Sequence, residues 1–193
     1  MSPERILIVV GHPVRQSYCG ELARSYKEGA LAKKAEVHEL YLGELNFDPL
    51  LRNGYAKIQP LEPDLVQAQA EISWANHLVI IYPNWWGMMP ALLKGFIDRT
   101  FLPGFAFKFS DENNGPAQKL FAGKSAHMIV TTDMERWYHR WLWRNPGHQV
   151  MKRAILEFCG INPVRVTTLP VQGSTPEQRA HWIRQVKKFG SHI

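Results

Sequence analysis

The sequence has 193 residues, of which 45% are hydrophobic and 21% are charged. This length fits one domain over residues 1–193, and the composition excludes a disordered chain, a collagen and a coiled coil. The net charge of +6 comes from basic residues scattered along the chain, so we expect a solvated basic surface and no nucleic-acid partner. No apolar run is long enough for a membrane span, no signal peptide is recognised and only two cysteines occur, which together predict a reducing, cytoplasmic location.

Strands and helices alternate in the hydrophobic pattern. Residues 5–10 form a continuous run dominated by β-branched side chains, typical of a strand buried on both faces, and Ser17 is a good N-cap for the helix that follows. Further strands are expected at 36–41, 77–82, 125–131 and 164–169, further helices at 61–72, 90–101, 150–160 and 176–189, and loops at 45–60 and 110–123. This order predicts an α/β fold: a doubly wound, five-stranded parallel sheet with helices on both faces and the flavodoxin-like strand order 2-1-3-4-5.

Ligands of such a sheet bind beyond the carboxyl ends of the strands, near the point where the strand order reverses. The first loop at this edge, residues 11–17, joins a strand to a helix N-terminus, whose free N–H groups and dipole favour an anion such as phosphate. His12, Arg15 and Ser17 add polar groups there. The loop lacks the glycines of a dinucleotide fingerprint, and a plain turn capped by Ser17 remains the alternative.

The second loop, residues 82–91, carries two adjacent indoles, Trp85 and Trp86, between Pro83 and Gly87. Indoles in an exposed loop need a partner surface, and a flat aromatic ligand is a natural partner. A hydrophobic dimer interface is the alternative, and the two interpretations are compatible.

The third loop begins at Thr131 and Thr132, whose hydroxyl and N–H groups suit the polar edge of a ring. Tyr138, His139 and His148 follow as candidate proton donors. Three further tryptophans, at 137, 141 and 143, form a dense aromatic patch that either covers the site or joins a subunit interface.

Residues 82–99, with the sequence Tyr-Pro-Asn-Trp-Trp-Gly-Met-Met-Pro-Ala-Leu-Leu-Lys-Gly-Phe-Ile-Asp-Arg, resemble the signature of the flavodoxin-like NAD(P)H:quinone oxidoreductases. Residues 102–107 and the Gly-His-Pro that follows the first strand are similar to the same family. The family includes quinone reductases, a bacterial modulator of drug activity and ancillary oxidoreductase subunits of potassium-efflux systems.

The resemblance implies a non-covalent flavin, either FAD or FMN, with NAD(P)H as co-substrate and no metal. It implies cofactor-binding roles for residues of all three loops, namely His12, Ser17, Tyr18, Cys19, Pro83, Asn84, Trp85, Trp86, Thr131 and Thr132, and catalytic roles for Tyr138 and His148. Members of the family carry a Thr-Thr-Gly-Gly turn, whereas Asp133 and Met134 replace both glycines here.

The expected function is therefore hydride transfer from NAD(P)H through the flavin to a quinone or a similar flat electrophile, by a ping-pong mechanism. A homodimer is expected from the family and from the exposed tryptophans. One alternative is a flavin-binding regulatory or electron-transfer subunit with a membrane partner such as a potassium-efflux transporter. Another is a flavin-free scaffold, which the joint presence of the tryptophan loop and the phosphate loop argues against.

Overall fold

The computed structural model describes residues 3–54, 56–109, 117–133 and 146–192. Its strands are β1 (Arg5–Val10), β2 (Glu36–Tyr41), β3 (His77–Asn84), β4 (Phe107–Lys108), β5 (Gln118–Lys119), β6 (Ser125–Thr132) and β7 (Val164–Pro170). Its helices are α1 (Tyr18–Leu31), the 3₁₀ turn η1 (Leu42–Glu44), α2 (Pro63–Trp74), α3 (Ala91–Thr100), α5 (Pro146–Gln149), the π-helix η2 (Val150–Glu157) and α6 (Pro176–Gly190).

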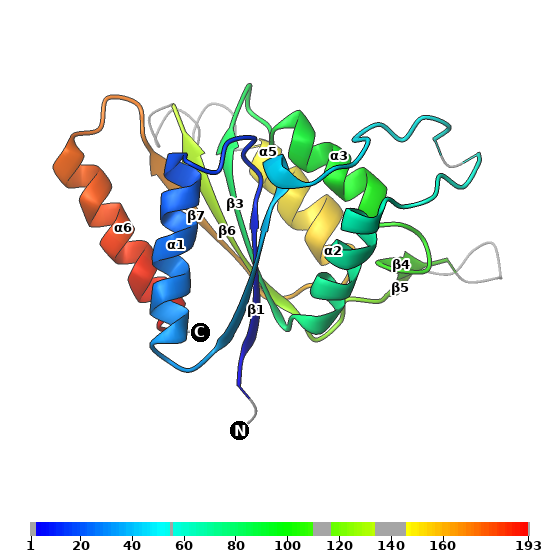
Figure 1. Cartoon of the computed structure of the whole chain (residues 1–193), viewed down its shortest axis with the longest axis horizontal. Helices are drawn as coiled ribbons and strands as arrows, with labels where there is room; N and C mark the ends of the chain where they lie inside the picture. The colour runs from blue at the N-terminus through cyan, green and yellow to red at the C-terminus, as the bar shows by residue number, and fades with distance from the viewer. Residues whose placement is uncertain (1–2, 55, 110–116, 134–145, 193) are drawn as a thin grey trace.

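The main sheet is parallel, with the strand order β2-β1-β3-β6-β7. This confirms the predicted order of the five strands. Helices α1 and α6 cover one face, and α2, α3 and η2 cover the other (Figure 1). Alternate residues of β1 enter the two cores: Ile6 and Ile8 pack under α1, whereas Leu7 and Val9 pack under α2 and α3. The continuous apolar run of this strand follows from that double burial.

Two expectations from the sequence are wrong in detail. Residues 110–123 were expected to form a loop, but Gln118 and Lys119 pair antiparallel with Lys108 and Phe107 as the hairpin β4–β5. Two-residue strands are too short to produce a period-2 pattern. A helix does form in the expected range 150–160, but its turns over Val150–Glu157 are π-helical, and a short α-helical turn, α5, precedes it. Apolar spacing at three and four residues does not distinguish these helix types.

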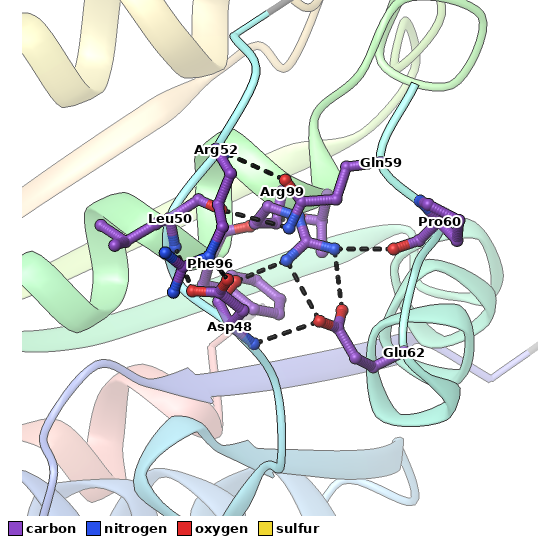
Figure 2. A network of polar contacts seen from close by, with 9 residues as sticks. Asp48, Leu50, Arg52, Gln59, Pro60, Glu62, Phe96 and Arg99 are labelled. Atoms are coloured by element: carbon purple, nitrogen blue, oxygen red, sulfur yellow. Dashed lines mark hydrogen bonds and ion pairs between the residues drawn. The ribbon is translucent and has the colours of Figure 1, made fainter. Parts of the chain in front are cut away.

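Arg99, near the end of α3, anchors the long connection between η1 and α2. Its guanidinium is wholly buried and donates to the carbonyl oxygens of Asp48 and Pro60, the latter at 2.8 Å (Figure 2). It also donates to both carboxylate oxygens of Glu62, at 2.8 and 3.2 Å. Burial alone would raise the pKa of Glu62, but the hydrogen bonds from Arg99 and from the Asp48 amide outweigh it and lower that pKa. One side chain therefore holds both ends of the expected surface loop against the body of the protein.

Candidate functional site

The three loops singled out in the sequence leave adjacent strands at one edge of the sheet. Val10 lies beside Ile81, and the Gly11 N–H donates to the Ile81 carbonyl at 2.8 Å. On the other side of β3, Pro83 pairs with Thr131 and Asn84 with Thr132. The structure thus brings together the starts of all three loops, as the rule for parallel sheets predicts.

The first loop ends at the N-terminus of α1. Ser17 is the N-cap, and its hydroxyl accepts a hydrogen bond from the Gly20 amide at 3.3 Å. The amides of Tyr18 and Cys19 lie in the first turn, where an α-helix offers no internal acceptor. Arg15 does not add free charge at this point, because it forms an ion pair with Glu44 at 2.7 Å. The anion-binding groups that remain are backbone N–H donors, the O–H of Ser17 and the helix dipole.

The second loop is a tight turn that presents both indoles outward. Trp85 and Met88 exchange backbone hydrogen bonds of 2.9 and 3.0 Å, and the two residues between them, Trp86 and Gly87, have positive φ values of 53° and 77°. Positive φ at both central positions is typical of a type I′ turn. The exposed fraction is 42% for Trp85 and 101% for Trp86. The indoles are therefore available to a ligand or partner and are not part of the core.

His12 and Trp85 connect the first two loops. Their ring centroids lie 5.7 Å apart at an interplanar angle of 67°, an edge-to-face contact. Trp85 keeps 42% of its surface exposed despite this contact. The phosphate-loop candidate and the aromatic turn are thus parts of one continuous site.

The third loop begins with two buried threonines. The Thr131 hydroxyl lies 3.7 Å from the Cys19 thiol, and both side chains are buried. Burial raises the pKa of Cys19 to about 11, so the thiol is neutral and its side chain is not a nucleophile at pH 7. Asp133, which replaces the first glycine of the family turn, is exposed. Tyr138, His139 and the three tryptophans of the aromatic patch lie outside the described residues.

His148 lies beside the aromatic turn, on α5, and is buried. Its neighbour Gly147 packs against the turn so closely that a β-carbon there would lie 2.2 Å from the Gly87 carbonyl oxygen. Only glycine allows this approach of α5 to the turn. A single glycine beside a histidine gives no pattern in the sequence, so this contact was not predicted.

A groove of about 560 Å³ lies between the N-terminal halves of α1 and α6. It adjoins Ser17, and Tyr18 and Arg179 contribute to its wall. The Tyr18 hydroxyl donates to the Arg179 carbonyl at 3.1 Å, and burial raises the pKa of this tyrosine to about 12. Arg179 was not identified from the sequence, because it is one of several basic residues on an amphipathic helix.

Among the described residues no cluster of histidine, cysteine and carboxylate side chains could hold a metal ion. None of the helices in the same residues combines the length with the hydrophobicity of a membrane span. The donor set at the sheet edge consists instead of exposed indoles, buried hydroxyl groups and helix-terminal amides. Aromatic surface beside anion-binding amides fits a flat heterocycle with a phosphate tail.

Comparison with known proteins extends over almost the whole chain. Residues 4–189 match the model of a family described as having a flavodoxin-like fold. The chain is 26% identical to rat NAD(P)H dehydrogenase [quinone] 1 over 203 residues, which cover 91% of this chain and 72% of that protein. The matched segments span 57% to 79% of the length of this and two other curated relatives.

Solved structures give the same assignment of the fold. The crystal structure of Smu.1420 from Streptococcus mutans superposes with a TM-score of 0.83 and is 30% identical, covering 97% of this chain and 99% of that one. An FMN-dependent NADH-azoreductase from Bacillus anthracis, solved in complex with FMN, superposes with a TM-score of 0.74 at 18% identity, covering 98% of each chain.

Proposed function

Since this chain belongs to the flavodoxin-like family that includes NAD(P)H:quinone oxidoreductases, we propose that it binds a flavin and reduces quinones or similar flat electrophiles with NAD(P)H. The observation that carries the proposal is the rigid turn that holds Trp85 and Trp86 exposed at the switch point of the sheet, beside the N-terminus of α1. A protein that kept the fold only as a scaffold would have no need to leave two indoles uncovered there.

The overall reaction is NAD(P)H + H⁺ + quinone → NAD(P)⁺ + hydroquinone, in which the nicotinamide loses a hydride and the quinone gains two electrons and two protons. A bound flavin would supply the two-electron chemistry of accepting and passing on that hydride. The residues of this chain have the tasks of binding, orientation and proton supply.

Each loop has one of these tasks in the proposal. The amides of Tyr18 and Cys19 and the hydroxyl of Ser17 bind the phosphate of the cofactor. Trp85 supplies the aromatic surface for the ring and is held in place by His12. His148, buried beside the turn, orients the acceptor or supplies a proton, together with Tyr138.

The groove between α1 and α6 favours FAD over FMN. It continues from Ser17 and offers about 560 Å³, with the tyrosine ring and guanidinium of Tyr18 and Arg179 in its wall. An adenylate half would find a stacking surface and a cation there. Denaturation of the purified protein and chromatography of the released cofactor test this choice: FAD is the expected product, and FMN alone would show that the groove has no part in cofactor binding.

Cofactor titration and turnover test the function itself. Trp85→Ala should weaken flavin binding about tenfold, since an aromatic contact contributes about 0.5–1.5 kcal/mol beyond its buried area. Trp74→Ala is the matched control, because it removes an indole that stacks on His38 with 3.8 Å between ring centroids, away from the three loops of the candidate site. NADPH oxidation should depend on both bound flavin and an added quinone, with parallel double-reciprocal plots because donor and acceptor share one open face.

A colourless protein that takes up neither FAD nor FMN would refute the proposal. A yellow protein that oxidises no nicotinamide with any quinone would instead favour the regulatory alternative. The homodimer and a transporter partner remain predictions, which molar-mass measurement and co-purification would test.

A further inference from the structure

A second cavity, of about 320 Å³, lies at the opposite end of the sheet, where β3 and β6 begin and where the C-terminus lies (Figure 1). It is unrelated to the three loops of the candidate site. Polar side chains from α1, β3, β6 and β7 line it, and the ring of Phe189 from α6 closes one side. The residues that matter here are Tyr26, His77, Ser125, His127, Arg165 and Phe189.

The strand register assembles these side chains on one face. His77 pairs with Ser125, and His127 pairs with Arg165 on the edge strand β7. Neighbouring residues in register point to the same side of a sheet, and the face concerned is the one covered by α1 and α6. Two buried histidines, a partly buried serine and an exposed arginine thus lie together at this end of the sheet.

Both histidines are buried and neutral. His77 is hydrogen-bonded to the Tyr26 hydroxyl at 3.2 Å and to the Ser125 hydroxyl at 2.7 Å, and His127 is bonded through Nε2 to the Thr167 hydroxyl at 2.9 Å. Burial, and then the charge of Arg165, lowers the pKa of His77 to about 4 and that of His127 to about 3. Imidazoles at this place therefore act as hydrogen-bonding groups and add no charge at pH 7.

Arg165 is the positive charge of the cavity. Within the described part of the chain, no carboxylate lies in ion-pair distance of its guanidinium. Glu4 is close enough to affect Tyr26 electrostatically, yet it forms no such pair. His192 is the remaining titratable residue in the lining. An exposed cation without an ion-pair partner in the described residues, beside neutral imidazoles, is suited to an anion.

The other walls are apolar. Phe189 and Pro163 supply this surface, and the Phe189 ring meets His127 edge to face at 5.0 Å between centroids. An inorganic ion would leave this surface without a partner, whereas a ligand with a flat apolar body would cover it.

We propose that this cavity binds a small organic carboxylate, whose charge pairs with Arg165 and whose flat body packs against Phe189 and Pro163. The site is separate from the flavin site, and the proposal does not rest on the oxidoreductase function.

Benzoate is a suitable probe, with benzyl alcohol as the neutral analogue and inorganic phosphate as the ion without an apolar body. We would titrate each into the purified full chain labelled with ¹³C-histidine and follow the ring signals of His77 and His127 by NMR. Benzoate should shift these two signals saturably, and the two other compounds should shift them at least tenfold more weakly. Because the readout is local to the cavity, benzoate bound near the tryptophans would not produce it.

Arg165→Gln should weaken benzoate binding at least tenfold and leave the flavin content unchanged. Arg165 is exposed, so the variant is expected to fold, and an unchanged melting temperature would confirm this. Arg153→Gln, at an exposed arginine of η2, is the matched control and should change the affinity less than twofold. Absent shifts, equal binding of benzyl alcohol or phosphate, or an undiminished affinity in Arg165→Gln would each overturn the proposal.

Discussion

The contact between Gly147 and the aromatic turn yields the sharpest prediction. Replacing Gly147 with alanine places a β-carbon 2.2 Å from the Gly87 carbonyl oxygen and 3.1 Å from the Met88 Cα. Ordinary contacts begin near 3.4 Å, so α5 and the turn have to separate by about 1 Å. A misplacement of this size costs about 10²-fold in rate when it lies between a substrate-positioning surface and a catalytic group. We therefore expect kcat/KM for a quinone, with NADPH as donor, to fall about 100-fold in Gly147→Ala.

Stability and activity separate this effect from general damage. Helix propensity alone would raise the free energy of unfolding of Gly147→Ala by about 0.5–1 kcal/mol, whereas overpacking should lower it by about 1–3 kcal/mol. Gly173→Ala is the control: its φ of 69° disfavours alanine, but no atom lies within 4 Å of the added carbon. The free energy of unfolding of Gly173→Ala in urea should be about 1 kcal/mol lower than that of the parent, and its activity should be unchanged. If Gly147→Ala retained a kcat/KM within threefold of the parent, the contact would have no role in positioning the site.

Three further predictions concern the turn, the anchor of the long connection and pH. Trp86→Gly should unfold at the same or a slightly higher urea concentration, since it relieves a positive φ of 53°, yet should bind flavin more weakly in a fluorescence titration. Arg99→Ala should lower the free energy of unfolding in urea by about 3 kcal/mol, because the carbonyls of Asp48 and Pro60 and the partly exposed Glu62 carboxylate lose their donor, whereas Arg52→Ala, from an exposed pair with a 2.5 Å contact, should lower it by less than about 1 kcal/mol. His77 and His127, whose pKa values burial lowers from 6.5 to about 4 and about 3, take up protons on unfolding. Stability should therefore fall below pH 6.5 by up to about 1.4 kcal/mol per pH unit for each histidine, and His127→Gln should halve that slope.

The sequence was sufficient to predict the sheet because its central strands β1, β3 and β6 are buried on both faces. A run such as 77–82 has one interpretation once helices flank it, and the register then brings the three loops together without further information. The N-cap at Ser17 and the outward tryptophans were likewise accessible, since capping and turn formation depend on neighbouring residues.

Features that depend on distant packing were not accessible. Arg99 looks like an ordinary basic residue near a helix end, and its complete burial follows from carbonyl groups about 40 to 50 positions away. In the sequence, the two histidines of the second cavity look like ordinary residues of strands β3 and β6. Only the pairing of neighbouring strands, such as that of His127 with Arg165, places them in one cavity. The π-helical turns over Val150–Glu157 could not be predicted either, because the spacing of apolar residues there is the same as in an α-helix.

The guanidinium of Arg99 has an evolutionary consequence for the connection that it holds. Its bonds to the carbonyls of Asp48 and Pro60 fix the two ends of this connection (Figure 2). Ile58, which lies between them in the sequence, is almost fully exposed. The entropy of closing a loop grows only slowly with its length. Insertions and deletions between the two clamped carbonyls should therefore be tolerated without disturbance of the sheet edge, which makes this stretch a natural cassette for diversification or for grafting a foreign peptide.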